Sequence, residues 1–282
     1  MSDSVTEANT SRFLESKGAK IHYHDAGEGP PIVLLHGSGP GATGWSNFGD
    51  NIVELSKRFR TIAIDFPGWG KSALDIPEDG RLVTAVRILL DELGVEKAAL
   101  VGNSMGGMTS IGFTAAYPDR VSHLITMGTG FAGANVYTGN TIESEGMKVL
   151  IGAYREPTPE NFKRLVEIMC FDPKFATDEL AKERSEAALA NPEFLEAVLT
   201  GRLMRVLPNL NEAVPTLMDL DVPTLAIHGR NDRTVHFENS MRLVSLVPNS
   251  RLVLLNRCGH WAQLEHAEEF NRLVSGFVAE AS

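Results

Sequence analysis

The feature that most constrains the fold is a serine between two glycines, directly after a short apolar run. Residues 98–103 read Ala-Ala-Leu-Val-Gly-Asn, and Ser104 follows, with Gly106 two positions later. A Gly-x-Ser-x-Gly sequence after a buried strand is typical of a strained turn into a helix, in which the glycines let two backbones approach closely. Apolar side chains then recur at helical spacing until Pro118. We therefore predict a strand, a sharp turn with Ser104 at its apex, and a helix.

Apolar strands alternate with amphipathic helices along most of the chain. Elements in this order form a mostly parallel sheet with helices on both faces, because each parallel connection needs a crossover. The predicted fold class is therefore α/β, with one central sheet. Besides the strand before Ser104, the predicted buried strands lie at residues 30–35, 61–65, 123–127, 222–228 and 251–255.

The alternation stops between residues 134 and 207, where helix signals occur without strand signals. Thr158, Thr177 and Asn191 are each suitable N-caps, and a proline follows two of them directly. This pattern predicts a helical insertion over the edge of the sheet. The predicted domains are a helical cap, residues 134–207, and an α/β core, residues 1–133 and 208–282.

The N-terminal residues give weaker signals. Residues 1 to about 11 are polar and are expected to form a loose tail. Residues 20–24 alternate apolar and polar side chains as an edge strand does, which would turn His22 and His24 toward solvent.

Composition restricts the partners and the compartment. The net charge of −10 without a basic block disfavours nucleic acid and anionic membranes, so an anionic substrate would need a local positive group. No apolar run approaches the length of a membrane span, and the first ten residues lack a secretory signal, so we expect a cytoplasmic protein. The two cysteines, Cys170 and Cys258, lack the spacing of a metal site, so no structural zinc is expected. We expect a small-molecule substrate and assembly as a homo-oligomer.

Ser104, Asp232 and His260 share one placement. Each follows a predicted strand, and the carboxyl ends of parallel strands meet at one edge of the sheet, where ligands bind. Their chain order, serine before acid before histidine, is that of the α/β-hydrolases. The pattern predicts that His260 activates Ser104, and that Asp232 fixes the imidazole tautomer and stabilises the imidazolium.

Other histidines and aspartates fit this pattern less well. His228 ends a buried strand, His236 lies on the acid's own loop, and His266 opens the last helix. Asp219 and Asp221 precede their strand and so lie at its wrong end. We therefore expect packing or solvation roles for these side chains.

A glycine-rich loop after the first buried strand is the predicted oxyanion hole. Residues 36–41 read His-Gly-Ser-Gly-Pro-Gly, and a loop of this kind leaves backbone N–H groups free. The α/β-hydrolases place an oxyanion donor upstream of the nucleophile, so the N–H groups of Ser38 and Met105 would hold a developing oxyanion. A phosphate-binding loop is disfavoured, because the Gly-Lys-Ser/Thr signature is missing. Gly37 and Gly39 are expected to line the substrate-binding site.

These motifs resemble those of the α/β-hydrolases that cleave carbon–carbon bonds in meta-cleavage products, the ring-fission products of aromatic degradation. The resemblance covers nearly the whole chain and rests on residues 36–47, 102–107 and 258–266. These segments contain Gly-Pro-Gly-Ala, an asparagine directly before the serine, and Cys-Gly-His-Trp, a combination that ordinary esterases usually lack.

The resemblance implies cofactor-free hydrolysis of a 2-hydroxy-6-oxohexa-2,4-dienoate with an alkyl or aryl group at C6, giving 2-hydroxypenta-2,4-dienoate and a carboxylic acid. It implies substrate contacts from Asn47, Asn103, Arg184 and Trp261. Arg184 has independent support, because a planar charged fork on a cap helix suits a carboxylate, although a solvated helix charge is the ordinary alternative. A carboxylesterase or lactonase with the same triad is the alternative function.

Carbon–carbon cleavage requires a proton transfer that ester hydrolysis does not, because the leaving group is a carbanion unless the dienol is first ketonised. His260 could shuttle that proton, so that the departing fragment leaves as an enolate. Direct attack by Ser104 and activation of a water by Ser104 both stay open at this point.

Two segments depart from the family that the chain resembles. Residues 233–236 read Arg-Thr-Val-His where similar enzymes tend to have Arg-Phe-Val-Pro, and Met169 stands where a cap phenylalanine is common. These differences leave the triad unaltered, and the identity of the C6 substituent stays open.

Overall fold

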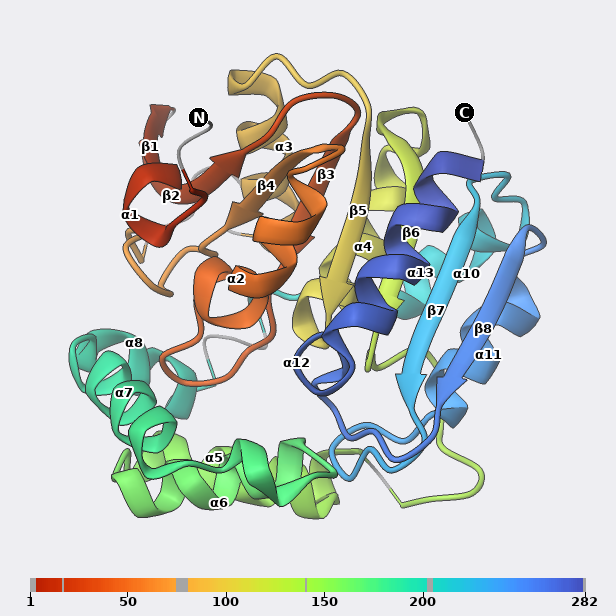
Figure 1. The fold of residues 1–282 in the computed structure, drawn as a ribbon. Helices are drawn as coiled ribbons and strands as arrows, with labels where there is room; N and C mark the ends of the chain where they lie inside the picture. Colours follow the sequence, from red (N-terminus) through yellow and green to blue (C-terminus); the bar gives the residue numbers. More distant parts are fainter. Residues whose placement is uncertain (1–3, 17, 75–80, 140, 202–204, 281–282) are drawn as a thin grey trace.

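The computed structural model describes residues 4–16, 18–74, 81–139, 141–201 and 205–280. Eight strands form one sheet in the order β1-β2-β4-β3-β5-β6-β7-β8 (Figure 1). β2 is antiparallel to both of its neighbours, and every other neighbouring pair is parallel. The predicted α/β fold with a mostly parallel sheet is confirmed. The strands are β1 Ser11–Ser16, β2 Ala19–Ala26, β3 Pro31–Leu35, β4 Arg60–Ile64, β5 Ala98–Asn103, β6 Val121–Met127, β7 Thr224–Gly229 and β8 Ser250–Leu255.

Helices cover both faces of the sheet, because successive side chains of a strand point to opposite faces. Ile32 and Leu34 pack in one core cluster with α2 (Gly44–Leu55) and α13 (Ala267–Glu280), whereas Val33 and Leu35 pack on the other face with α3 (Leu82–Glu92). The helices α4, α10 and α11 share a third cluster on that second face (Figure 1). Their bounds are α4 Met105–Ala116, α10 Leu210–Met218 and α11 Glu238–Leu246, and the short α12 spans Ala262–Glu265.

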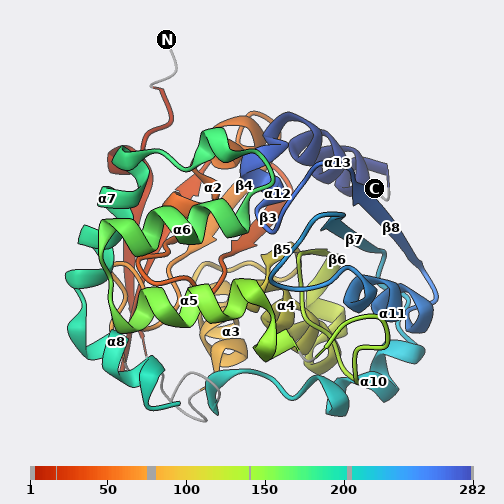
Figure 2. The ribbon, with the colours of Figure 1, turned by 90° about the horizontal axis from the view of Figure 1, so that it is seen from below.

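Four helices lie together beyond the carboxyl ends of the parallel strands (Figures 1 and 2). Three begin at the predicted N-caps Thr158, Thr177 and Asn191, whose side chains each accept a backbone N–H of the first turn. Their position is that of a cap over the sheet edge, while the division into domains at residues 134 and 207 stays a prediction. These helices are α5 Glu145–Arg155, α6 Pro159–Met169, α7 Asp178–Leu189 and α8 Pro192–Leu199.

The N-terminal expectations were wrong in two respects. The described part of the tail contains α1 (Glu7–Thr10) with a capping box at Thr6, followed by β1. β1 takes the edge position, so β2 is an inner strand, and His22 and His24 are buried rather than solvent-facing.

Polar partners explain how these two histidines are accommodated in the core. His22 bonds Ser11 Oγ at 2.7 Å and Asp65 Oδ2 at 2.7 Å through its two ring nitrogens, and Thr10 Oγ1 lies 2.8 Å from His24 Nδ1. A buried polar group is tolerated when it is hydrogen-bonded. These partners therefore take the place of the water that the expected exposure of the two histidines would have supplied.

Within the described ranges, no helix is both long enough and apolar enough to cross a membrane.

Candidate active site

Ser104 occupies a strained turn between β5 and α4. Its backbone angles are φ 52° and ψ −113°, and its N–H donates to the Met127 carbonyl at 2.8 Å. A positive φ in a residue with a Cβ costs about 1–3 kcal/mol and persists only where the surroundings enforce it. The predicted strand, turn and helix around Ser104 are confirmed.

The glycines that flank the serine are required by close backbone contacts. A Cβ at Gly102 would lie 2.4 Å from the Gly106 carbonyl carbon, and a Cβ at Gly106 would lie 1.9 Å from the Leu35 oxygen. Both distances are far shorter than a van der Waals contact, so any larger residue would push α4 away from β5 or β3. The turn at Ser104 therefore depends on both glycines.

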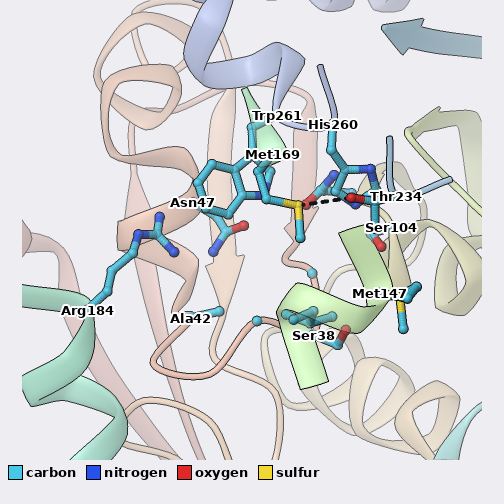
Figure 3. A pocket seen from close by; sticks show the side chains of 14 residues that line it. Ser38, Ala42, Asn47, Ser104, Met147, Met169, Arg184, Thr234, His260 and Trp261 are labelled. Carbon is cyan, nitrogen blue, oxygen red and sulfur yellow. Dashed lines mark hydrogen bonds between the residues drawn. The ribbon is translucent and has the colours of Figure 1, made fainter. Parts of the chain in front are cut away.

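Asp232 and His260 form a hydrogen-bonded pair at the ends of neighbouring strands. His260 Nδ1 lies 2.7 Å from Asp232 Oδ2, and the other carboxylate oxygen accepts the N–H groups of Thr234 at 2.8 Å and Val235 at 2.9 Å. Because the carboxylate can only accept, Nδ1 carries the proton, which leaves Nε2 as the acceptor. His260 and Ser104 line the same cavity (Figure 3).

The environment of Asp232 keeps its carboxylate ionised. Burial alone would raise the pKa of Asp232, but the charge of His260 and hydrogen bonds from His228 and His260 outweigh burial and hold the pKa well below its usual range. His228 Nε2 lies 2.8 Å from the Val235 oxygen and 3.2 Å from Asp232 Oδ2, so it donates to both. His228 is buried as expected, but the sequence analysis missed its contact with the acid.

The glycine-rich loop is fixed by a second buried histidine. His36 Nε2 accepts the N–H of Phe66 at 3.0 Å, so Nδ1 is protonated and donates to the Gly37 oxygen at 2.7 Å. Burial chiefly lowers the pKa of His36, which agrees with a neutral ring. The Tyr154 hydroxyl donates to the Ser38 oxygen from α5. The sequence analysis missed both side chains, although His36 stands directly before the loop that it holds.

A small cavity of about 30 Å³ lies beside Ser104. It brings together nine of the predicted site residues, while Met105 lines the adjoining cavity and Asp232 lies behind His260. A volume of this size is close to that of one water molecule. The predicted residues that line it are Gly37, Ser38, Gly39, Asn47, Asn103, Ser104, Arg184, His260 and Trp261.

Two buried polar atoms of this cavity lack a hydrogen-bond partner. Arg184 is only 6% exposed; its Nη2 donates to the Ser46 oxygen at 3.3 Å, and its Nε has no partner. The other unpartnered atom is Asn103 Oδ1, whose amide nitrogen donates to Met127. A buried guanidinium with spare donors favours an anionic ligand, so Arg184 is not a solvated helix charge.

A larger cavity of about 580 Å³ adjoins the small one and shares Ser38, Ser104 and Met147 with it. Its wall is mainly apolar, and no Lys, Arg or His belongs to it among the described residues. Ser104 therefore stands where a small cavity lined by Arg184 and His260 meets a larger one whose described wall has no cation. The remaining lining residues are Met105, Met108, Gly130, Phe131, Gly133, Ala134, Asn135, Thr138, Gly139, Thr141, Leu207, Val235 and Asn239.

The two departures from the family pattern touch each other. Thr234 Oγ1 donates to Met169 Sδ at 3.3 Å, and both side chains line the small cavity (Figure 3). Thr234 also requires glycine at position 146 of α5, since a Cβ there would lie 2.1 Å from Thr234 Oγ1. The unusual residues at positions 169 and 234 therefore pack against each other.

No three His, Cys, Asp or Glu side chains in the described part of the chain are grouped as metal ligands would be.

Comparison with known proteins gives the family. Residues 32–273 match the model of the alpha/beta hydrolase family. The chain belongs to this family. The 2-hydroxy-6-oxononadienedioate/2-hydroxy-6-oxononatrienedioate hydrolase 1 of Pseudomonas putida is 41% identical to this hydrolase over 97% of this chain and 98% of its own length. The Escherichia coli (strain K12 / DH10B) hydrolase named for the same two substrates is 42% identical over 97% of each chain.

Solved structures place the hydrolase among the meta-cleavage product hydrolases. The meta-cleavage product hydrolase CumD from Pseudomonas fluorescens IP01 is 34% identical with a TM-score of 0.84, over 98% of this chain and all of that one. The 2-hydroxy-6-oxo-6-phenylhexa-2,4-dienoate hydrolase BphD from Rhodococcus sp. strain RHA1 is 29% identical with a TM-score of 0.78, over 95% of this chain and 99% of that one. The family predicted from the sequence motifs is confirmed.

Proposed function

We propose that this hydrolase cleaves the C5–C6 bond of a 2-hydroxy-6-oxohexa-2,4-dienoate that carries an alkyl or aryl group at C6. The observation that carries the proposal is the position of Ser104 between a small cavity lined by the buried Arg184 and a larger, mainly apolar one. Such a substrate has a carboxylate at one end, an apolar group at the other and a ketone between them. An esterase for neutral esters needs the serine but has no need of a buried guanidinium beside it.

The carboxylate end of the substrate would lie at the small cavity, which has room for about one water and would have to widen to admit it. Arg184 offers unpartnered donors there, and Asn47 and Asn103 supply amide groups beside it. The Trp261 ring lies under the guanidinium and keeps the planar fork directed at the ligand. Because α7 carries Arg184, we propose that residues 134–207 act as a cap that closes the site over the substrate.

The reaction needs a proton on C5 before the bond can break. His260, with Nε2 facing the cavity, would take the proton of the 2-hydroxyl and deliver a proton to C5, which converts the dienol to a ketone. Water or the Ser104 hydroxyl then adds to the C6 carbonyl, and the N–H groups of Ser38 and Met105 stabilise the oxyanion. The C5–C6 bond breaks, and its electron pair forms the enolate of the departing fragment.

The products account for every atom of the substrate and one water. The five-carbon fragment leaves as 2-hydroxypenta-2,4-dienoate, and C6 gains the water oxygen and becomes a carboxylic acid. If Ser104 is the nucleophile, an acyl-enzyme forms and His260 activates the water that releases the acid. If Ser104 only orients the water, no acyl-enzyme forms. Asp232 has the same role in both routes, which is to hold the His260 tautomer and stabilise the imidazolium.

Names of relatives support the substrate class. The P. putida relative is named for a nonadienedioate, BphD for a 6-phenyl dienoate, and CumD as a meta-cleavage product hydrolase. The first two names specify dienoates that differ in the group beyond the ketone, and the third gives only the class. The cytoplasmic location and homo-oligomeric assembly expected from the sequence are further proposals, which cell fractionation and light scattering would test.

A panel of ring-fission dienoates tests the proposal. Loss of the conjugated dienol absorbance, with equal release of 2-hydroxypentadienoate and an acid, is the expected result, with or without a chelator. Efficient turnover of p-nitrophenyl esters with the whole panel unchanged would replace the proposal by the carboxylesterase or lactonase alternative. Acid quenching during turnover of an isotope-labelled substrate would trap an acyl-enzyme on Ser104 only if the serine is the nucleophile.

A further inference from the structure

Glu265 at the end of α12 connects two segments that are far apart in sequence. One carboxylate oxygen accepts the N–H groups of Phe171 at 2.7 Å and Asp172 at 2.9 Å. The other oxygen accepts the N–H of Gly259 at 2.5 Å. Both oxygens are therefore used, and all three partners are backbone groups. The first two belong to the connection between α6 and α7, and the third directly precedes His260.

The same two segments are in direct backbone contact. The N–H groups of His260 and Trp261 both donate to the Met169 oxygen, at 2.6 and 3.3 Å. A Cβ at Gly259 would lie 2.4 Å from that same oxygen and 3.0 Å from the Cys170 Cα. Gly259 thus permits the approach, and Glu265 adds hydrogen bonds to both backbones.

This junction joins two groups of the site that must act on one substrate. The loop at residues 258–261 carries His260, which would move the protons, and Trp261, which contacts the guanidinium of Arg184. The connection at residues 170–177 leads into α7, which carries Arg184 itself. A shift of either segment would alter the distance between the histidine and the arginine.

We propose that Glu265 is a positioning residue that sets the His260 loop against the α6–α7 connection. The proposal rests on the proposed roles of His260 and Arg184. Glu265 does not line the cavity beside Ser104, so it acts through the backbone that it holds. Misplacement of a reacting group by about 1 Å can cost on the order of 100-fold in rate. Loss of the carboxylate should therefore slow every reaction that needs His260.

Two variants with different defects test the role. Glu265→Gln keeps the length of the side chain but has one acceptor oxygen instead of two, so it cannot hold both segments. Glu265→Asp keeps both oxygens but is one methylene shorter and cannot reach both. The matched control is Glu268→Gln, which removes an exposed carboxylate three residues away. If one Glu265 variant fails to fold, the other is enough to test the positioning role.

The main readout is the rate at which a small fluorophosphonate labels Ser104, well below the unfolding temperature. This reaction needs the Ser104–His260 pair but neither Arg184 nor a dienoate. We expect Glu265→Gln and Glu265→Asp to slow labelling by about 10- to 100-fold. We expect Glu268→Gln to label at the wild-type rate, and kcat on the dienoate to follow the same pattern.

Hydrogen exchange gives a second readout that a general loss of stability would not reproduce. In both Glu265 variants, exchange should rise together in the peptides that contain residues 170–172 and 258–261 and stay unchanged in β5 and α4. Labelling of both variants within twofold of wild type would overturn the positioning role. Wild-type protein that labels but cleaves no dienoate would refute the proposed substrate, and the comparison of variants would still decide the role of Glu265.

Discussion

The guanidinium of Arg184 lies over the indole ring of Trp261, with its central carbon 4.5 Å from the ring centroid. This stacking, together with the bond to the Ser46 oxygen, holds a buried fork whose Nε has no partner. We predict that Arg184→Ala lowers kcat/KM for a dienoate by about 100-fold, because a charge-assisted hydrogen bond in a buried site contributes about 1.5–3 kcal/mol. Steady-state kinetics on a dienoate and on a neutral p-nitrophenyl ester provide the measurement.

The contrast between the two substrates is the control for this prediction. The neutral ester does not need the arginine, so its kcat/KM should change by less than about threefold. Arg184→Lys should recover only part of the loss, since an ammonium cannot form two parallel bonds or stack as the planar fork does. Equal losses on both substrates would contradict a carboxylate-binding role for Arg184.

The second prediction separates the two chemical steps. Ser104→Ala and His260→Ala should each lower turnover of a dienoate by about 10³- to 10⁶-fold, because members of a triad act as one unit. Stopped-flow absorbance should show that Ser104→Ala still converts the bound dienol to its ketone, whereas His260→Ala leaves the dienol unchanged. Circular dichroism should show the wild-type fold for both. A His260 variant with near-normal turnover would contradict the triad assignment.

Local sequence patterns predicted the parts of the fold that depend on neighbouring residues. The β5–Ser104–α4 turn was predicted because the glycines at 102 and 106 are needed within a few residues of the serine. The N-caps Thr158, Thr177 and Asn191 were predicted because capping bonds close within three residues. The chain order of strands also placed Asp232 and His260 at one sheet edge.

Features that depend on distant partners were missed. The burial of His22 requires Ser11 and Asp65, and no local pattern shows that these side chains meet at its ring nitrogens. Glu265 looks like an ordinary helix charge until its contacts with residues 171 and 172 are known. α10 was missed for a local reason, because Pro215 inside it interrupts the helical pattern.

The third prediction concerns the group at C6. We expect kcat/KM for dienoates with a neutral alkyl or aryl group to exceed that for the 2-hydroxy-6-oxononadienedioate by at least about tenfold. The described wall of the large cavity has no cation, and the amide nitrogens of Asn135 and Asn239 already donate to the carbonyls of Gly139 and His236. A second carboxylate would be buried there without a cation in the wall, because Arg242 lies behind Asn135 and Asn239 and already bonds their amide oxygens. Such burial costs several kcal/mol.

Matched substrates make the comparison strict. A propyl group at C6 and a carboxyethyl group at C6 have similar size and differ in charge, so the ratio of their kcat/KM values reports the charge alone. Ala134→Lys would add a cation at an exposed position of the cavity wall, and we expect it to raise the relative activity on the dienedioate. If the wild type instead preferred the dienedioate, this prediction would be wrong. The preferred C6 group would then match the substrate in the name of the P. putida relative.

The fourth prediction concerns stability against pH. Burial chiefly, and the nearby charge of His22, lower the pKa of His24 to about 4 from an ordinary value of 6.5. The folded protein therefore binds this proton less readily than the unfolded chain does, so stability is fully present above about pH 6.5 and falls as the pH drops toward 4. His24→Asn keeps a polar group beside Thr10 Oγ1 but does not titrate. Between pH 6.5 and 4.5, urea unfolding should show that the wild type loses about 2 kcal/mol more stability than this variant. Parallel curves for wild type and His24→Asn would contradict the assignment to His24.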